Sequence, residues 1–307
     1  MSMSEDQIVA WFQRKSRLSL SRFPIGIGDD MAQVRLDAGV SVFITTDMLL
    51  EGVHFNLNKA TLKQVGYKAM AVNLSDCAAM ATIPLAAVVS VALPKGFGAS
   101  ELKQLHSGIV QAGRRFGCEL VGGDITGWHS DHPFVVNVAM LSKQAANKPV
   151  RRSGAKPGDI ICVTGYLGGS LAGKHLRFVP RVKEALKLAQ MVKLHSMMDL
   201  SDGLSSDLPR ICRQSSVGAI VDARRIPASV QAHKSSNPLN SALNDGEDFE
   251  LLFTLPPAQF HRLLKYWVDP LPITAIGEIT TVKKLRIKMP DGCVTPLQPK
   301  GYDHLRD

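Results

Sequence analysis

Segments typical of β-strands alternate with segments typical of α-helices along this chain, and the alternation limits the fold to a mixed α/β class. In the first half, β-branched runs bounded by Gly, Pro or Asp predict strands at Val40–Thr46, Leu85–Leu93 and Phe134–Leu141. The spacing of apolar residues between them predicts helices at Leu62–Ala81 and Ala99–Phe116. In the second half, strands are expected at Ile160–Thr164, Ala219–Asp222, Glu250–Thr254, Ile273–Gly277 and Lys284–Met289, with helices between them.

A polar segment, Ser142–Asp159, separates the two halves. It contains two prolines and two glycines, a composition typical of a boundary between domains. Because 307 residues is the usual length of about two domains, we predict an N-terminal domain at residues 1–145 and a C-terminal domain at residues 146–307. Both are expected to be mixed α/β domains.

The composition excludes several classes of protein. With 45% hydrophobic and 21% charged residues, the chain is globular rather than disordered. Its longest largely apolar run, Leu85–Leu93, has nine residues including one serine, too few to cross a membrane, and its first residues carry acids where a signal peptide needs bases. We therefore expect a cytoplasmic protein without a membrane partner. The five cysteines form no C-x-x-C pair, so neither a zinc site nor a disulfide framework is indicated.

The net charge of +9 raises the question of a nucleic-acid partner. The chain has no block of five like charges, and only 6% of its residues are aromatic. Neither a basic arm nor a surface for base stacking can be identified, so we expect no nucleic-acid partner. The excess of positive charge fits small polyanionic ligands equally well.

Acidic residues recur in glycine-rich turns and at a strand end in the first half. In GIGDD, Asp30 follows two glycines, and in TTDMLLEGVHF two hydroxyls and Asp47 end a strand that looks buried. In VGGDIT, two glycines precede Asp124, which suggests a loop for a phosphate or a metal ion. Strand ends are where folds present ligand-binding groups, although tight turns and helix caps use the same residues.

Asp76 lies on the apolar side of a predicted helix. Val65, Ala69, Val72 and Asp76 recur at helical spacing, so the carboxylate falls on the stripe that should face the core. An ionised carboxylate there needs a cation or several hydrogen-bond donors. A metal ion is one solution, and a salt bridge or a backbone cap is the other.

Two acidic motifs follow in the second half. In MMDLSDGLSSDL, Asp199, Ser201 and Asp202 precede a predicted helix. An acid at a helix N-terminus can cap the helix and is stabilised by its dipole, which accounts for one of the two acids more easily than for both. NDGEDFELLF contains four acids immediately before an apolar strand, where a solvated turn is the alternative: Asp245, Glu247, Asp248 and Glu250.

Oxygen ligands without cysteine or paired histidines suit a hard cation. Mg²⁺ in particular is usually held by a few carboxylates and the phosphates of a substrate, so we predict nucleotide phosphate chemistry. The segment Gly168–Lys174, GGSLAGK, matches the first part of a P-loop. A P-loop then needs Ser or Thr for the metal, and here the next residue is His175. We reject that interpretation.

Taken together, the motifs resemble the thiamine-monophosphate kinase family, which shares a superfamily with aminoimidazole ribonucleotide synthetase and selenophosphate synthetase. The resemblance covers nearly the whole chain, in the order GIGDD, TTDMLLEGVHF, YKAMAVNLSDCAAMA, VGGDIT, RSGAKPGD, VTGYLGGSLAG, MDLSDGLSSDL, GEDFELLF and GYDHL. It implies phosphorylation of thiamine monophosphate to thiamine diphosphate, with ATP as co-substrate and several Mg²⁺ ions. It also implies a homodimer that joins the N-terminal sheets, with a C-terminal α/β domain that covers the cleft.

The resemblance also implies site residues at the matching positions. The metal shell would comprise Asp30, Thr45, Thr46, Asp47, Asp76, Asp124, Asp199 and Asp202. ATP would contact Gly123, Asp124, Arg152 and Ser201, with Arg151 as a competitor for Arg152. Thiamine monophosphate would contact His54, Glu247 and Tyr302. Another ATP-using enzyme of the superfamily, a metal-dependent phosphohydrolase and a silent nucleotide-binding protein remain alternatives.

We expect no residue to act as a general base. The acceptor is a phosphate oxygen with a second pKa of about 6, so it is already largely ionised at neutral pH. The chain departs from the family pattern in three places: Asp245 stands where Gly is usual, Gly169 stands where an acid is common, and the segment after Gly173 is short. These changes affect the substrate end of the site and leave the proposed metal ligands in place.

Overall fold

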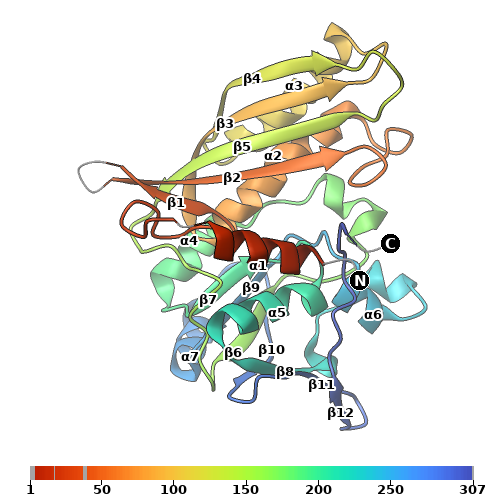
Figure 1. Ribbon diagram of the computed structural model, residues 1–307. Helices are drawn as coiled ribbons and strands as arrows, with labels where there is room; N and C mark the ends of the chain where they lie inside the picture. Colours follow the sequence, from red (N-terminus) through yellow and green to blue (C-terminus); the bar gives the residue numbers. More distant parts are fainter. Residues whose placement is uncertain (1–3, 17, 37–39, 306–307) are drawn as a thin grey trace.

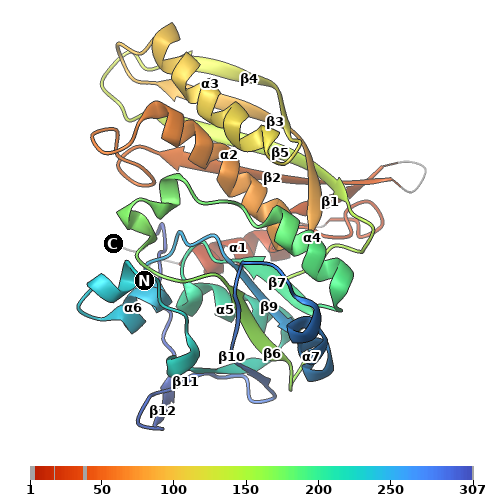
Figure 2. The ribbon, with the colours of Figure 1, turned by 180° about the vertical axis from the view of Figure 1, so that it is seen from behind.

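The chain folds into two β-sheets with helices packed on them (Figure 1). The computed structural model describes residues 4–16, 18–36 and 40–305. The first sheet has five strands in the order β1-β2-β5-β3-β4, and the second has seven in the order β12-β11-β8-β10-β6-β9-β7. Seen from behind, α2 and α3 lie over one face of the first sheet (Figure 2). The helices drawn in Figure 1 leave the opposite face of that sheet open. The mixed α/β class predicted from the sequence is confirmed.

The strands of the first sheet are antiparallel except for β3 and β4, which pair in parallel. Side chains of β2 alternate between the two faces: Phe43 and Leu49 are buried, whereas Ile44 and Met48 are exposed. Because of this alternation, Thr45 and Asp47 share the face that α2 covers. The bounds are β1 (Ala32–Arg35), β2 (Ser41–Leu50), β3 (Thr82–Leu93), β4 (Glu119–Gly127) and β5 (Val135–Gln144).

Helix α2 (Leu62–Ala79) is the most deeply buried helix of the described part of the chain. It begins at Thr61, whose side chain accepts from the Gln64 amide while the Gln64 side chain accepts from the Thr61 amide. It packs closely on α3 (Ala99–Arg114) at a glycine, because a Cβ atom on Gly108 would lie 1.9 Å from the backbone oxygen of Lys63. The two helices therefore touch backbone to backbone.

The second sheet is buried on both faces. Along β9, Leu251 and Phe253 join the core shared with the first half, whereas Leu252 joins a second core around α5. The strands are β6 (Ile160–Thr164), β7 (Ser196–Asp199), β8 (Gly218–Asp222), β9 (Leu251–Leu255), β10 (Ile273–Thr280), β11 (Leu285–Lys288) and β12 (Val294–Pro296). The helices are α1 (Glu5–Lys15), α4 (Val182–Met191), α5 (Leu204–Ser215), α6 (Pro238–Asn244) and α7 (Pro257–Tyr266).

The larger core is continuous between the two sheets. It runs from β2, β3 and β5 through α2 to α4, β7 and β9. Helix α2 contacts both α4 and β7, so it is packed between the first sheet and the second half of the chain. The division into domains at residue 145 stays a prediction. Among the described helices, each is too short or too polar to cross a bilayer.

One sequence interpretation was wrong. VGGDIT was expected to be a loop, but Gly122, Gly123 and Asp124 lie inside strand β4, which pairs with β3 through Val88, Val89 and Ser90. The glycines fit because β4 and β3 approach closely: a Cβ atom on Gly123 would lie 2.0 Å from the backbone oxygen of Val89. The predicted strands and helices named above are present, with ends displaced by a few residues.

The glycine contact between α2 and α3 gives a stability prediction. Gly108→Ala should destabilise the fold by about 1–3 kcal/mol, because the new methyl group must push two packed helices apart. Ser107→Ala, at the neighbouring exposed position of the same helix, is the matched control and should change stability by less than about 0.5 kcal/mol. Urea unfolding measures both, and equal stabilities of the two variants would contradict the close contact.

Candidate active site

A cavity of about 630 Å³ lies where the first sheet and α2 face the second half of the chain. It collects side chains from α1, the Gly28–Asp30 turn, β2, α2, the end of β7, the C-terminal half of α5 and the C-terminal tail. Twelve residues predicted from the sequence line it: Asp30, Thr45, Thr46, Asp47, His54, Asp76, Arg152, Asp199, Ser201, Asp202, Glu247 and Tyr302.

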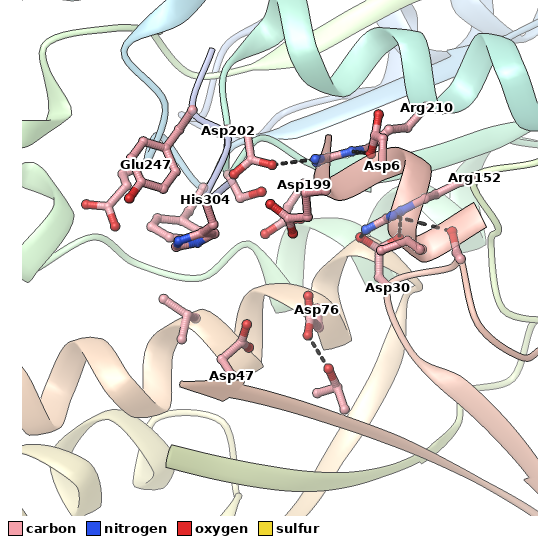
Figure 3. Close-up of a pocket in the computed structure, with 18 of the residues that line it drawn as sticks. Asp6, Asp30, Asp47, Asp76, Arg152, Asp199, Asp202, Arg210, Glu247 and His304 are labelled. Atoms are coloured by element: carbon pink, nitrogen blue, oxygen red, sulfur yellow. Dashed lines mark hydrogen bonds and ion pairs between the residues drawn. The ribbon is translucent and has the colours of Figure 1, made fainter. Parts of the chain in front are cut away.

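Three carboxylates meet in the middle of this cavity. Asp30, Asp76 and Asp199 each offer an oxygen within 4.8 Å of the others. Figure 3 shows Asp47 and Asp76 on one side of the cavity and Asp199 on the other, so the two halves of the chain present acids to each other. The geometry is that of a site for a cation.

The fold places these acids by simple means. Asp76 lies near the end of α2, on the side that faces the cavity, and accepts a hydrogen bond from the Thr45 hydroxyl. Asp199 is the last residue of β7 and accepts from Ser75, the neighbour of Asp76 on α2, at 2.5 Å. A hydroxyl next to each acid thus fixes its orientation.

Burial changes the acidity of the cluster. Burial, together with the nearby Asp30 carboxylate, raises the pKa of Asp47 to about 6 and that of Asp199 to about 7. The pKa of Asp76 lies well above its ordinary value, mainly because of burial and then because of Asp47 and Asp199. Without a cation, the cluster therefore retains protons near neutral pH.

The residues present fit a hard divalent cation. The Oδ2 atom of Asp47 is buried and has no hydrogen-bond partner among the described residues. Burial of such an oxygen is costly unless a cation binds the carboxylate or a proton neutralises it. The candidate ligand atoms of these acids and of the neighbouring Thr45 are carboxylate and hydroxyl oxygens, the ligands that Mg²⁺ prefers. Asp30, Asp47, Asp76 and Asp199 are the residues that could hold it.

Two arginines pair with acids at the edge of the cluster. Arg152 makes a two-pronged contact with Asp30, at 3.0 Å from Nε and 2.8 Å from Nη2. Arg210 contacts Asp202 at 2.6 Å and Asp207 at 2.7 Å. Of the two candidate arginines, Arg152 lines the cavity, whereas Arg151 is half-exposed, contacts Asp29 and does not line the cavity itself.

Histidine and aromatic side chains line the other end of the cavity. His54 accepts a hydrogen bond from the Leu50 amide at Nδ1, which leaves the proton of the neutral ring on Nε2. Burial and then the charge of Lys68 lower the pKa of His54 to about 4, so it is neutral at physiological pH. Its ring lies 5.2 Å from that of His304, which in turn contacts Tyr302.

The two family departures in this region contact each other. The Asp245 carboxylate accepts from the Gly169 amide at 2.8 Å. Gly169 has a φ of +71° and no room for a Cβ atom, because that atom would lie 2.6 Å from Gln231. After Gly173 the chain forms a short 3-10 turn before α4.

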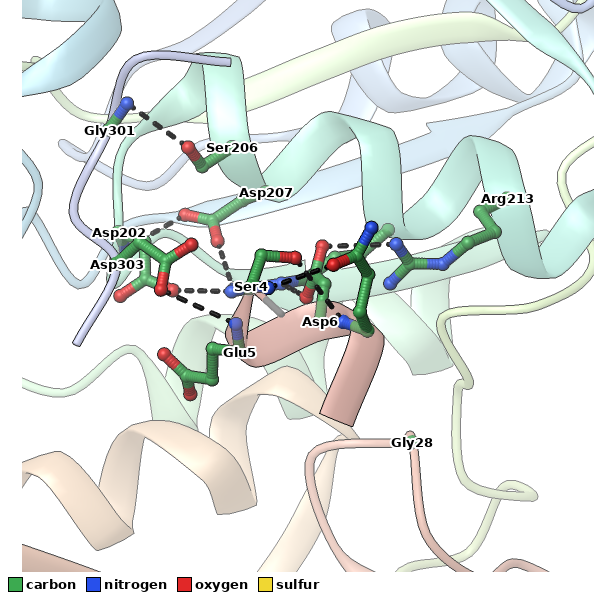
Figure 4. Close-up of polar contacts among 12 residues, drawn as sticks. Ser4, Glu5, Asp6, Gly28, Asp202, Ser206, Asp207, Arg213, Gly301 and Asp303 are labelled. Atoms are coloured by element: carbon green, nitrogen blue, oxygen red, sulfur yellow. Dashed lines mark hydrogen bonds and ion pairs between the residues drawn. The ribbon is translucent and has the colours of Figure 1, made fainter. Parts of the chain in front are cut away.

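Helix α1 covers part of the cavity, a position that no sequence motif predicts. Asp6 pairs with Arg210 and Arg213, and the Glu5 amide donates to Asp303 in the C-terminal tail (Figure 4). Glu5, Asp6 and Gln13 line the cavity. Sequence reasoning also missed Arg210 and His304, although His304 belongs to the motif GYDHL and lies two residues after Tyr302.

Gly123 and Asp124 are not brought to this cavity. They lie on β4, separated from β2 by β5 and β3 in the sheet order. Asp124 is exposed, opposite Ser90 of β3. Their predicted roles in binding ATP and metal therefore find no support within a single chain.

Comparisons with known proteins match both halves of the chain. Residues 28–143 match the N-terminal domain, and residues 151–290 the C-terminal domain, of AIR synthase related protein. The thiamine-monophosphate kinase of Rhodopirellula baltica is 34% identical over 98% of this chain and 97% of its own. That of Escherichia coli K12 is 32% identical over 99% of each chain.

Solved structures show the same fold. AaThiL complexed with AMPPCP and TMP has a TM-score of 0.82 and 28% identity, covering 99% of both chains. The hydrogenase maturation protein HypE shares the fold at 18% identity, with a TM-score of 0.73 in its complex with HypF. From the full-length similarity to curated relatives, this chain belongs to the thiamine-monophosphate kinase family.

Proposed function

We propose that this chain transfers a phosphoryl group from ATP to thiamine monophosphate and forms thiamine diphosphate. The observation that carries the proposal is the group of buried carboxylates, Asp30, Asp76 and Asp199, within 4.8 Å of one another in a chain of this family. The similar structure of AaThiL with AMPPCP and TMP, an ATP analogue and the acceptor, supports the same substrates.

Magnesium ions would be held by Asp30, Asp47, Asp76 and Asp199, with Thr45, Thr46 and Asp202 beside them. Bound there, Mg²⁺ supplies charge neutralisation for two polyanions that repel each other and for the transferred phosphoryl group. Arg152, which pairs with Asp30, is placed to bind a nucleotide phosphate once a cation neutralises that acid. Ser201 lines the same side of the cavity.

The chain's own residues bind and orient the acceptor without taking its proton. His54 is neutral and carries its proton on Nε2, so it can donate a hydrogen bond to a phosphate oxygen and is a weak base. Glu247 and Tyr302 line the same end of the cavity and would hold the organic part of thiamine monophosphate. Catalysis then rests on placement and charge, with no general base.

We also propose that the chain forms a homodimer through the open face of the first sheet. Apolar side chains are exposed on that face from three neighbouring strands, at Ile44 and Met48 of β2, Leu141 of β5 and Val88 of β3. A row of this kind favours a protein partner. Asp124 lies on the same face, so Gly123 and Asp124 would take part in a site only where two protomers meet.

The remaining proposals concern organisation and location. We infer that residues 1–145 and 146–307 are the two domains, since each carries one of the two sheets. Since ATP and thiamine monophosphate are intracellular metabolites, we place the protein in the cytoplasm.

The activity is tested by incubating the protein with ATP, Mg²⁺ and thiamine monophosphate and measuring thiamine diphosphate by chromatography. We expect product from the monophosphate and none from free thiamine. Asp76→Asn should reduce turnover by roughly 100-fold or more while keeping the circular dichroism of the fold, because it removes a metal-binding charge and no packing group. Asp131→Asn, at an exposed position, is the control. ADP formation without thiamine diphosphate would refute the acceptor assignment.

Metal binding should depend on pH. Because the pKa of Asp47 is about 6 and that of Asp199 about 7 in the metal-free fold, both groups stabilise that fold when protonated. This stabilisation is fully present below the pKa that these carboxyl groups have in the unfolded chain, and it is lost as the pH rises toward 7. Mg²⁺ binds the groups in their ionised form, which predominates at the higher pH. The increase in melting temperature on adding Mg²⁺ and ATP should therefore grow between about pH 5 and about pH 7.5. An increase that is the same across this range would contradict the shared site.

The dimer proposal is tested by light scattering after size-exclusion chromatography. The molar mass measured for the wild-type protein should be twice that of one chain. Val88→Glu should shift it toward the monomer, because the new charge would be buried in the interface. Val230→Glu changes a more exposed valine outside that face and should leave the mass unchanged. A monomeric wild-type protein at micromolar concentration would rule the dimer out.

A further inference from the structure

Lys68 is a fully buried lysine beneath the acceptor end of the cavity. Its side chain is 0% exposed, and it does not line the cavity itself. Its ammonium group donates to the Glu247 carboxylate at 2.6 Å and 2.8 Å and to the backbone oxygen of His54 at 2.6 Å. The fourth neighbour is His175 Nδ1, at 3.1 Å. One cation thus joins α2 to three separate segments.

A buried ammonium group is costly unless charge and hydrogen bonds compensate it. Here Glu247 supplies the charge, and His54 and His175 supply further contacts. Burial lowers the pKa of Lys68, whereas Glu247 acts in the opposite direction. Although burial alone would raise it, the pKa of Glu247 is held below its ordinary value by His175 and Lys68. The pair is therefore an ion pair at neutral pH.

The backbone around Glu247 needs such a contact. Glu247 has a φ of +53°, a left-handed conformation that residues other than glycine rarely adopt. Its amide donates to the Ser201 oxygen at 2.6 Å, which ties the segment to the end of β7. The side chain is fixed from the other direction by Lys68. Glu247 is thus held between the metal-binding side of the cavity and α2.

We propose that Lys68 is a positioning residue that sets the affinity for the acceptor, by fixing the Glu247 carboxylate and the His54 backbone from below. The inference rests on the proposed function, since it assigns the two fixed residues to thiamine monophosphate. The proposal predicts a change in the affinity for thiamine monophosphate and none in the affinity for ATP. The reason is that the contacts of Lys68 all lie at the acceptor end and none reaches Asp30, Asp76 or Arg152.

The test compares Lys68→Met with Lys63→Met, which removes a lysine from an exposed position of the same helix. We expect Lys68→Met to raise KM for thiamine monophosphate by about tenfold or more and to leave KM for ATP within about twofold. Lys63→Met should behave like the wild type. If the two KM values of Lys68→Met rise together, or if neither changes, the positioning role is wrong.

A second variant separates positioning from simple charge balance. Lys68→Met leaves the buried Glu247 carboxylate without its cation, so its melting temperature should fall. The double variant Lys68→Met/Glu247→Gln removes both charges and should recover much of that loss, while KM for thiamine monophosphate stays raised. It also carries the test if Lys68→Met does not fold. A double variant with wild-type KM would overturn the proposal.

Wild-type turnover in the same assay distinguishes the two claims. If the wild type does not phosphorylate thiamine monophosphate, the proposed function fails, and the role of Lys68 fails with it. If the wild type is active and Lys68→Met has an unchanged KM for the acceptor, only the role of Lys68 is refuted.

Discussion

Burial of like charges between the two halves of the chain is the constraint on which this structure depends. Asp30, Asp47, Asp76 and Asp199 lie in a place that the surrounding fold shields from water. Such a cluster destabilises a protein unless protons, arginines or metal ions compensate it. Arg152 compensates Asp30 by pairing with it. The other acids, whose pKa values are raised, are compensated by the protons that they retain, and a bound cation is the third compensation.

The position of α2 makes the cluster possible. This helix is covered by the first sheet on one side and by α4 and β7 on the other, so most of its residues are buried. It can therefore present Asp76 to one end of the cavity and support the other end with Lys68. The distance between the two functions is fixed by the helix itself, because both residues belong to one rigid element.

The sequence predicted residues whose local pattern was inconsistent with an ordinary surface. Asp76 was found because an acid on an apolar helical stripe requires a partner, and Asp199 because it and Asp202 both precede a helix whose N-terminus explains only one acid easily. Lys68 also lies at helical spacing from Val65 and Val72, but two of its three partners come from segments more than 100 residues away, so the sequence does not reveal its role. VGGDIT was misread because close packing against β3, which no single sequence reveals, selects glycines inside a strand. Among the acids of GEDFELLF, only Glu247 reaches the cavity, while Asp248 binds the Gly168 amide and Glu250 binds Arg181.

The continuous core between the sheets has a consequence for how the gene could be divided. If residues 1–145 and 146–307 were made as two polypeptides, each would expose the apolar surface that now joins α2 to α4, β7 and β9. The acids of the cavity would also be shared between the two products, with Asp76 on one and Asp199 on the other. Assembly of the cavity would then require two polypeptides to associate. At low concentration the activity would therefore depend on the square of the protein concentration, whereas the activity of the intact chain is proportional to it.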